Sequence, residues 1–248
     1  MSLSKAAVVL AAGKGKRMKS DLPKVLHQIN NKSLIRHVME TMAEFSFDKL
    51  VVVVGHKGEM VIDELADFKA DFVWQKEQLG TGHAVMMAED HFKAFNGIVL
   101  VAAGDVPFLA AETITRLLKT HMDNKASATC LSVDFDNPEG YGRIIRDRDS
   151  DVLLDIIEEK DAGEDIKRIK EVNSGTFCFN CPDLFGVLHN LKNDNAQGEY
   201  YLTDTIKILQ SKGNKCAVFK TSNPLEVAGV NSFKQLKQLE DALNQKNH

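Results

Sequence analysis

Continuous apolar runs alternate with amphipathic stretches along the first two-thirds of the chain. Each run is short and lacks a polar face, which is typical of a strand buried on both faces of a parallel sheet. The pattern predicts strands at Ala6–Leu10, Leu50–Val54, Phe72–Trp74, Ile98–Ala102 and Ala128–Val133.

Apolar residues at helical spacing predict helices between these strands. The first follows a candidate N-cap at Ser33 and has its apolar positions at Leu34, Ile35, Val38, Met39 and Met42. Further helices are predicted at Gly58–Leu65, Gly82–His91 and Thr113–Met122. This alternation predicts an α/β fold with a mostly parallel, Rossmann-like sheet and helices on both faces.

The rhythm changes after Asp134. Short strands are expected at Gly142–Ile145, Val152–Ile157 and Gly175–Phe179, and helices at Leu184–Leu191 and Leu202–Lys212. A last helix is expected from Ser232, with Phe233, Leu236, Leu239 and Leu243 along one side. We therefore expect a single domain over 1–248, in which a strand-rich insertion covers one side of a substrate cleft.

Composition excludes several classes of protein. The 248 residues carry 31 Lys+Arg and 35 Asp+Glu, a formal net charge of -4, which gives no bulk attraction to nucleic acid or to an anionic membrane. No apolar run approaches the roughly 18 residues of a transmembrane helix. Four cysteines are too few for a disulfide scaffold at this length, so we expect a cytoplasmic protein.

A glycine-rich, basic segment follows the first strand directly. Five cations lie close together there: Lys14, Lys16, Arg17, Lys19 and Lys24. Gly13 and Gly15 would let backbone N–H groups approach a polyphosphate, so the segment is a candidate anion site. It is not a P-loop, because Gly-x4-Gly-Lys-Ser/Thr is missing, and it is not a dinucleotide fingerprint, because Met18 stands at the third glycine position. A solvated basic turn is the alternative.

Two further polar residues follow predicted strands. Asp105 lies where ligands bind in open α/β sheets, and a carboxylate beside a cationic loop suits Mg²⁺. The alternative for Asp105 is a simple turn residue. Gln75 offers an amide that matches the edge of uracil or thymine, or of cytosine when flipped, and its alternative is a surface position.

Other signals are weak. Cys178 and Cys181 form a C-x-x-C, but no paired histidines accompany it at zinc-finger spacing, so we interpret these as core cysteines. The eight histidines are scattered, and no Gly-x-Ser-x-Gly elbow is present.

Taken in order, the motifs resemble those of the sugar-nucleotide pyrophosphorylases, and most closely the uridyltransferase domain of the N-acetylglucosamine-1-phosphate uridyltransferases. The matching segments run through the whole chain: Leu10–Met18 with Leu22–Lys24, Gln75–Ala84, Gly104–Pro107, Gly140–Ile144, Glu158–Ala162, Glu171–Gly175, Asn195–Asp204 and Glu226–Asn231. The first motif marks only the broad superfamily, whereas Asn195–Asp204 is specific to the N-acetylglucosamine branch.

The resemblance implies a nucleotide-diphospho-sugar transferase fold, with a nucleotide-binding half at 1–133, a sugar-binding half at 134–231 and a C-terminal helix at 232–248. It implies an enzyme that transfers the uridylyl group of UTP to N-acetylglucosamine 1-phosphate, with Mg²⁺ as cofactor. The products would be UDP-N-acetylglucosamine, a peptidoglycan and cell-wall precursor, and pyrophosphate.

The resemblance also implies residue roles. Arg17 and Lys24 would neutralise the phosphates, and Asp105 and Asn231 would ligate Mg²⁺. The nucleotide would be held by Leu10, Ala11, Ala12, Gly13, Gln75, Gly80 and Thr81. The sugar and its acetamido group would be bound by Gly142, Glu158, Asn173, Tyr201 and Thr203.

The chemistry of this reaction fits the residues. A sugar phosphate is already an anionic nucleophile at neutral pH, so no strong general base is needed, and neither a Ser/His/Asp set nor a carboxylate pair is evident. The obstacle is repulsion between two anions, which positioning and positive charge relieve.

Three departures from the family's pattern bear on function. Lys16 stands where threonine is usual and adds a cation to the loop. Ala103 stands where the relatives carry tyrosine, so another sugar phosphate or nucleotide is an alternative substrate. The relatives trimerise largely through a left-handed β-helix that does not appear before His248, so we expect no trimer. A catalytically silent module, the third interpretation, predicts loss of the charged site residues, which are present.

Overall fold

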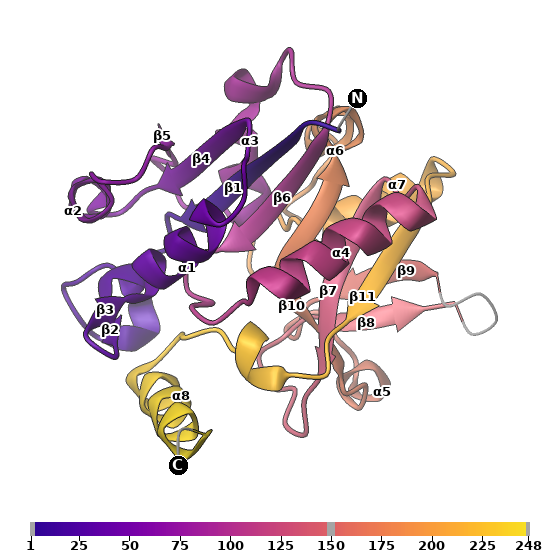
Figure 1. Cartoon of the computed structure of the whole chain (residues 1–248). Helices are drawn as coiled ribbons and strands as arrows, with labels where there is room; N and C mark the ends of the chain where they lie inside the picture. The colour runs from indigo at the N-terminus through magenta and orange to yellow at the C-terminus, as the bar shows by residue number, and fades with distance from the viewer. Residues whose placement is uncertain (1–2, 148–151, 247–248) are drawn as a thin grey trace.

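The computed structural model describes residues 3–147 and 152–246 and places most of its strands in one twisted sheet (Figure 1). The strand order is β11-β7-β10-β6-β1-β4-β5, with β8 and β9 attached beside β10. The main strands are β1 (Lys5–Ala11), β4 (Lys49–Val54), β5 (Asp71–Trp74), β6 (Ile98–Ala103), β7 (Ala128–Asp134), β10 (Glu171–Asn180) and β11 (Cys216–Lys220).

The central strands pair in parallel, as the alternation of strand and helix predicts. β1 lies between β4 and β6 and is parallel to both, and β5 continues the parallel set. β10 is inserted antiparallel between β6 and β7. β8 (Arg143–Arg146) and β9 (Leu153–Ile157) form an antiparallel pair that joins β10 where Arg143 meets Val172. The predicted fold class, including the strand-rich insertion, is confirmed, whereas the functional division into halves stays a prediction.

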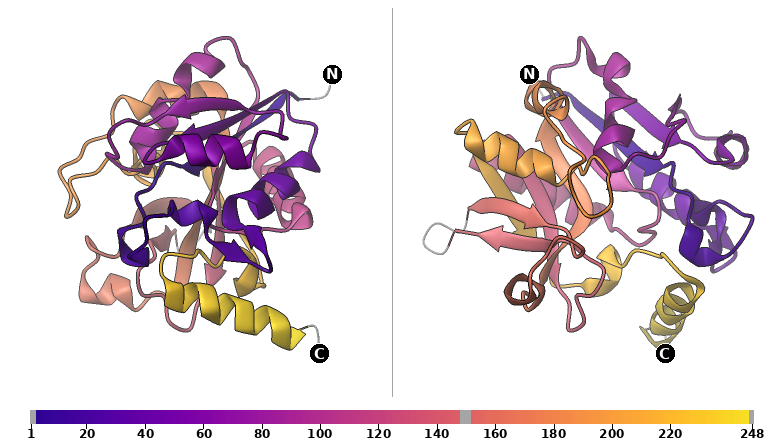
Figure 2. Two further views of the ribbon diagram at one scale, coloured as in Figure 1. Left: turned by 90° about the vertical axis from the view of Figure 1, so that its left-hand side faces the viewer. Right: turned by 180° about the vertical axis from the view of Figure 1, so that it is seen from behind.

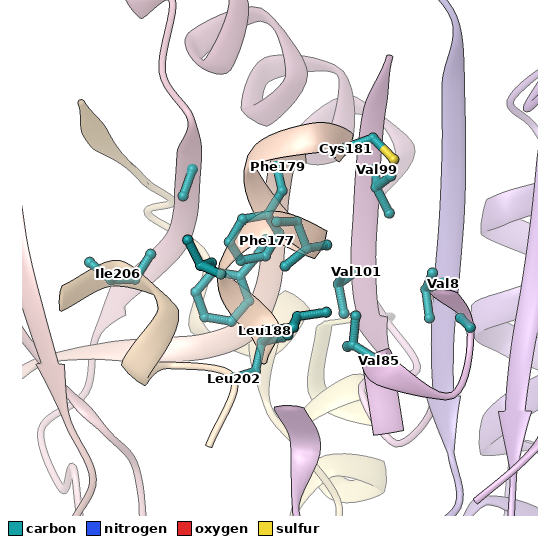
Figure 3. Close-up of a cluster of buried hydrophobic side chains, with 14 of the residues drawn as sticks. Val8, Val85, Val99, Val101, Phe177, Phe179, Cys181, Leu188, Leu202 and Ile206 are labelled. Carbon is teal, nitrogen blue, oxygen red and sulfur yellow. The ribbon is translucent and has the colours of Figure 1, made fainter. Parts of the chain in front are cut away.

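Alternate residues of each central strand enter opposite hydrophobic layers. Val8 of β1 belongs to the buried cluster that α3 (Thr81–Met86), α6 (Cys181–Leu188) and α7 (Asp204–Ser211) complete on one face (Figure 3). Val9 packs with α1 (Leu34–Ala43), α2 (Gly58–Glu64) and α4 (Ala111–Asn124) on the other. Because each fully buried aliphatic side chain contributes about 1.5–3 kcal/mol, two such layers fix the sheet between its helices.

Several elements differ from the sequence prediction. The helix expected over Gly82–His91 ends at Met86, and a 3-10 turn over Glu89–Phe92 continues the apolar face. The helices expected at Leu184–Leu191 and Leu202–Lys212 occupy Cys181–Leu188 and Asp204–Ser211. Each shift is a few residues, because packing decides where a terminal turn ends.

Other elements carried too weak a pattern to be predicted. The hairpin of β2 (Gln28–Ile29) and β3 (Lys32–Ser33), the edge strand β11 and the short helix α5 (Glu164–Lys167) belong to this group. The segment expected to be a simple loop holds 3-10 turns at Lys16–Met18 and Lys24–Leu26, and a further one lies at Pro224–Val227.

Both predicted N-caps are confirmed. Ser33 Oγ accepts a hydrogen bond from Arg36 N at 3.2 Å at the start of α1. Ser232 Oγ accepts one from Gln235 N at 3.3 Å at the start of α8 (Phe233–Lys246). Residues 247–248, which the predicted last segment included, lie outside the described residues.

One edge of the sheet gathers the candidate residues. The carboxyl ends of β1, β4, β5 and β6 share this edge, and β10 begins there because it runs in the opposite direction. The hairpin β2–β3 and α8 lie on one side of the edge, and β8, β9 and α5 lie on the other (Figures 1 and 2). This is the position at which open α/β sheets bind their ligands.

Candidate active site

A lysine, an aspartate and an asparagine from distant parts of the chain meet beyond the ends of β1 and β6. Lys24 Nζ forms an ion pair with Asp105 Oδ2 and lies 3.1 Å from Asn231 Oδ1. The side chains of Lys24 and Asp105 are only 17% and 13% exposed, so their contact is shielded from water. The side-chain oxygens of Asp105 and Asn231, both predicted as metal ligands, therefore contact the same ammonium group, that of Lys24. Together with Arg17, these three residues are called the phosphate side.

The start of α8 fixes Asn231. Its backbone N–H donates to Gln235 Oε1 at 2.9 Å, while Gln235 N donates to Ser232 Oγ. This exchange resembles a capping box, which satisfies the free N–H groups at a helix start. A second restraint is the hydrogen bond from Val230 N to the carbonyl oxygen of Asp105 at 3.0 Å, which ties together the two loops that carry the predicted metal ligands.

The glycine-rich loop is anchored by buried contacts on one side and exposed to solvent on the other. Gly15 has φ +58°, and a Cβ added to it would lie 2.7 Å from Lys24 Cβ, so only glycine allows this close approach. Met18 is buried against Leu239 of α8, which anchors the loop. Gly13, Lys14 and Arg17 are exposed above this anchor. The charge of Arg17 acts on Tyr141 and lowers the pKa of its hydroxyl, although burial raises that pKa more.

The residues predicted to hold the nucleotide line the ends of neighbouring strands. Leu10 is half-buried, Ala11 and Ala12 are buried, and the built Cβ of Gly55 would lie 2.6 Å from Ala12 O. The β1 loop and the β4 loop therefore touch through their backbones.

The amide of Gln75 has one orientation. Its Nε2 lies 2.9 Å from Gly80 O and 3.0 Å from His83 Nδ1. A backbone carbonyl only accepts, so the atom facing Gly80 is the nitrogen, and Oε1 faces away as an acceptor. The flipped amide that would suit N3 of cytosine is therefore disfavoured, because it would break the bond to Gly80.

Gly80 and Thr81 are joined to the segment Tyr200–Leu202. Leu202 N donates to Thr81 Oγ1 at 3.0 Å, and Tyr200 N donates to Leu79 O at 2.7 Å. Gly80 has φ +111°, and a Cβ on it would lie 2.5 Å from Tyr200 O. The hydroxyl oxygen of Thr81 thus holds the turn together, and the turn joins the predicted base site to the predicted sugar site.

Four of the predicted sugar residues form one connected group, called the sugar side: Gly142, Glu158, Asn173 and Thr203. Thr203 Oγ1 donates to Glu158 Oε1 at 3.0 Å. A Cβ built on Gly142 would lie 3.3 Å from Glu158 Oε1. Asn173 N donates to Gly142 O at 2.9 Å. Tyr201, the fifth, is buried, and its hydroxyl accepts from Gln197 Nε2 at 2.9 Å.

Carboxylates on the sugar side are held in a poorly solvated, acidic environment. Burial raises the pKa of Glu158, although the hydrogen bond from Thr203 opposes the shift. Burial, assisted by the charges of Asp155 and Asp161, raises the pKa of Asp204 to about 6. Burial also raises the pKa of Tyr201 to about 12.

The two sides are neighbours. A Cβ built on Gly175 would lie 3.8 Å from Ala103 Cβ, which places the start of β10 against the end of β6, two residues before Asp105. Tyr141 precedes Gly142 and faces Gly229, whose backbone hydrogen bond and the charge of Asp105 both act on the tyrosine pKa.

Several residues that support the site were not predicted. Gln235 completes the Ser-x-x-Gln pattern of a capping box, so the sequence did contain a signal for it. Arg143, which is 1% exposed, pairs with Glu159 at 2.7 Å and restrains the turn that carries Glu158. Cys130 contacts Asn173, and nothing in the sequence indicates that contact.

Other candidate features are less close to this chemistry. A cavity of about 360 Å³ lies between Tyr141 and α8, and its lining shares Tyr141, Gly229, Gln235 and Leu239 with the surroundings of the site. Within residues 3–147 and 152–246, no three His, Cys, Asp or Glu side chains converge on a metal position. In the same part of the chain, no helix combines the length and apolarity that crossing a membrane requires.

This fold and site define an α/β nucleotidyltransferase. Residues 7–244 match the family described as the MobA-like NTP transferase domain, and the chain belongs to that family. The resemblance inferred from the motifs is thereby confirmed at the level of the nucleotidyltransferase class.

Curated relatives include the bifunctional protein GlmU of Staphylococcus carnosus (strain TM300), which is 47% identical over 240 residues, 97% of this chain and 52% of the relative. The bifunctional protein GlmU of Syntrophomonas wolfei subsp. wolfei is 45% identical over 97% of this chain and 53% of its own length. The chain thus spans about half the length of the curated relatives it matches.

Solved structures share the fold. A UDP-glucose pyrophosphorylase complexed with UDP-glucose superposes with a TM-score of 0.74 at 19% identity and covers 98% of this chain and 100% of its own. A putative glucose-1-phosphate thymidylyltransferase from Bacillus anthracis, in complex with a sucrose, gives 0.76 at 18% identity over 96% and 95% of the two chains. At these identities the likeness concerns the fold alone.

Proposed function

We propose that the protein transfers the uridylyl group of UTP to N-acetylglucosamine 1-phosphate and releases UDP-N-acetylglucosamine and pyrophosphate. The observation that carries the proposal is the position of the phosphate side directly beside the sugar side at one edge of the sheet. This juxtaposition suits a reaction that joins a nucleotide phosphate to a sugar phosphate. The motif resemblance supplies the particular nucleotide and sugar.

Charge neutralisation is the main task of the phosphate side. Arg17 is exposed, whereas the side chain of Lys24 is only 17% exposed, so the two cations would contact different phosphates of UTP. The sugar phosphate oxygen attacks the α-phosphorus in line, and pyrophosphate departs with the bonding electron pair. Positioned positive charge lowers this barrier because the attacking and leaving groups are both anions.

Asp105 and Asn231 would hold Mg²⁺. A carboxylate and an amide oxygen that already converge on an ammonium group form a donor set suited to a hard cation. Mg²⁺ usually takes only one or two protein ligands and completes its shell with water and phosphate oxygens, which suits this small set. When bound, the ion would supply further neutralisation of the phosphates.

Base recognition would use Gln75 with the ends of β1. Oε1 of Gln75 faces away from Gly80 and can accept a hydrogen bond, which would match N3–H of uracil. Leu10, Ala11, Ala12 and Gly13 would approach the nucleotide through their backbone, and Gly80 and Thr81 would form the opposite wall. Thymine has the same N3–H, so dTTP is the stringent control nucleotide.

Sugar selection would rest on buried hydrogen bonds. A pocket built to bond an acetamido group or hydroxyl rejects an analogue that lacks it, because its own polar groups are then left unpaired. Ala103 removes a tyrosine side chain from this wall, so the alternative within the same proposal is a different sugar phosphate. UDP-N-acetylglucosamine made here would serve peptidoglycan precursor synthesis.

The test is pyrophosphate release with Mg²⁺ from UTP, CTP or dTTP and a panel of sugar 1-phosphates. N-acetylglucosamine, glucosamine, glucose and N-acetylgalactosamine 1-phosphates form the panel. Turnover confined to UTP with N-acetylglucosamine 1-phosphate supports the proposal. Turnover with another pair would keep the reaction type but assign a different substrate. Folded protein that binds UTP but shows no turnover with any pair would favour the catalytically silent module.

Asp105→Ala tests the metal assignment. We expect a loss of about 10²-fold or more in kcat, because a metal ligand and a counter-charge are removed together. Asp136→Ala is the matched control, since Asp136 pairs with Lys170 at 3.4 Å on the surface. Substantial activity in Asp105→Ala would contradict the assignment.

A further inference from the structure

The side chain of Asn173 is fixed by two donors. Its Oδ1 accepts a hydrogen bond from Gly175 N at 2.8 Å and lies 3.3 Å from Cys130 Sγ, which donates to it. A backbone N–H can only donate, so the Asn173 atom facing Gly175 is the oxygen. The amide NH₂ is therefore left for a ligand, since no acceptor contacts it among the described residues.

An irregularity in β10 creates this arrangement. The register of β10 against β7 shifts between Asn173 and Phe177, as at a β-bulge, and Gly175 adopts φ +80° there. Ser174 Oγ accepts from Thr176 N at 3.2 Å and closes the turn. Bulges beside active sites re-aim a side chain, and this one brings Gly175 N back toward its neighbour Asn173.

Cys130 supplies the second donor from the adjacent strand. It is fully buried in β7, and burial raises the pKa of its thiol well above the ordinary value, so the group keeps its proton. Its sulfur also lies 3.4 Å from Leu131 O, so two acceptors share one proton. A thiol is a weak donor, and its effect here is on orientation.

We propose that Cys130 is a positioning residue for the sugar substrate: with Gly175 N–H it holds Asn173 so that the amide NH₂ donates to an acceptor oxygen of the sugar. The inference rests on the proposed function and deepens it. Glu158, whose Oε1 is engaged by Thr203, supplies the complementary acceptor for a sugar hydroxyl. Asn173 and Glu158 would therefore recognise one hydrogen-bond acceptor and one hydrogen-bond donor on the same sugar.

Kinetics of Cys130→Ala, Cys130→Ser and Cys178→Ala test the proposal. Cys178 is the matched control, because it is equally buried, lies in β10 and has no hydrogen-bond contact with Asn173. In Cys130→Ala we expect the KM for the sugar 1-phosphate to rise about threefold, the effect of losing a weak hydrogen bond, with the KM for UTP unchanged. Cys130→Ser, which keeps a donor, should restore most of the affinity.

Two kinetic outcomes would overturn the proposal. One is a sugar KM in Cys130→Ala equal to that of the wild type. The other is an equal rise in Cys178→Ala, which would mean that loss of core packing alone moves the KM. A deoxy analogue lacking the acceptor that Asn173 contacts should abolish the difference between Cys130→Ala and the wild type.

A measurement without substrate separates this proposal from the proposed function. The side-chain NH₂ signals of Asn173, assigned in NMR spectra by their loss in Asn173→Asp, report on the contact directly. We expect them to shift in Cys130→Ala and to stay in place in Cys178→Ala. Unshifted signals in Cys130→Ala would overturn the positioning role even in an active enzyme. A shift in a protein that turns over no substrate would place the failure in the proposed function.

Discussion

The phosphate side and the sugar side differ in the charge that they concentrate. On the phosphate side, the two cations Arg17 and Lys24 come from one short segment, and Asp105 and Asn231 contact Lys24 from distant parts of the chain. On the sugar side, neutral and acidic groups from four segments meet through short hydrogen bonds such as that from Thr203 to Glu158. The contrast indicates that a charged ligand needs a local concentration of charge, whereas a hydroxylated ligand needs a fixed, poorly solvated geometry.

Among the variants that test this comparison, Lys24→Ala should have the largest effect, a loss of turnover. We expect kcat to fall about 10² to 10³-fold, because the variant loses a cation that we propose to stabilise the departing pyrophosphate. Lys170→Ala, which breaks an exposed ion pair with Asp136, is the control and should leave turnover unchanged. Steady-state pyrophosphate release measures both variants, and equal kinetics for them would remove Lys24 from the phosphate side.

Thr203→Val should act on the sugar side alone. The change removes the donor to Glu158 and leaves a buried carboxylate oxygen without its partner. We expect the KM for the sugar phosphate to rise about tenfold, which corresponds to about 1.4 kcal/mol, while the KM for UTP stays unchanged. Thr205→Val, a fully buried threonine in the same helix region that bonds Leu202 O, is the matched control. A parallel rise in both KM values would show that the two sides are not separable.

Asp204→Asn should have the smallest effect, on stability. The native pKa of Asp204, raised to about 6, exceeds its value in the unfolded chain. The native state therefore binds the proton more tightly, and this group's contribution to stability is lost as the pH rises through about 6. The Tm of Asp204→Asn relative to the wild type should be higher at pH 7.5 than at pH 4.5. A difference independent of pH would contradict the raised pKa.

Much of the fold was predictable because its central strands are apolar on both faces. Val8 and Val9 belong to one continuous run that fills both layers of the core, and such runs mark parallel strands. The β2–β3 hairpin was missed because its two-residue strands are defined only by their pairing. β11 does contain a short apolar run, Cys216–Phe219, which was not assigned to a strand.

The candidate site likewise contains some residues that the sequence indicates and some contacts that it does not. The cationic loop is visible in sequence because its glycines and cations are close together. Asp105 is indicated by its place after an apolar strand, and motif resemblance added Asn231. The contact of Cys130 with Asn173 joins residues 43 positions apart and depends on a bulge in β10, so no local pattern indicates it. The orientation of the Gln75 amide likewise follows only from the position of Gly80 O.

The anchoring of Met18 beneath Leu239 has a consequence for synthesis on the ribosome. The cationic loop emerges early, whereas its anchor and the proposed metal ligand Asn231 are made more than 200 residues later. A nascent chain can therefore assemble most of its sheet while the loop is still unanchored. In the proposed enzyme, competence to hold a nucleoside triphosphate would then arise only after Leu239 has been made, and a ribosome stalled before Leu239 would display the sheet without a finished site.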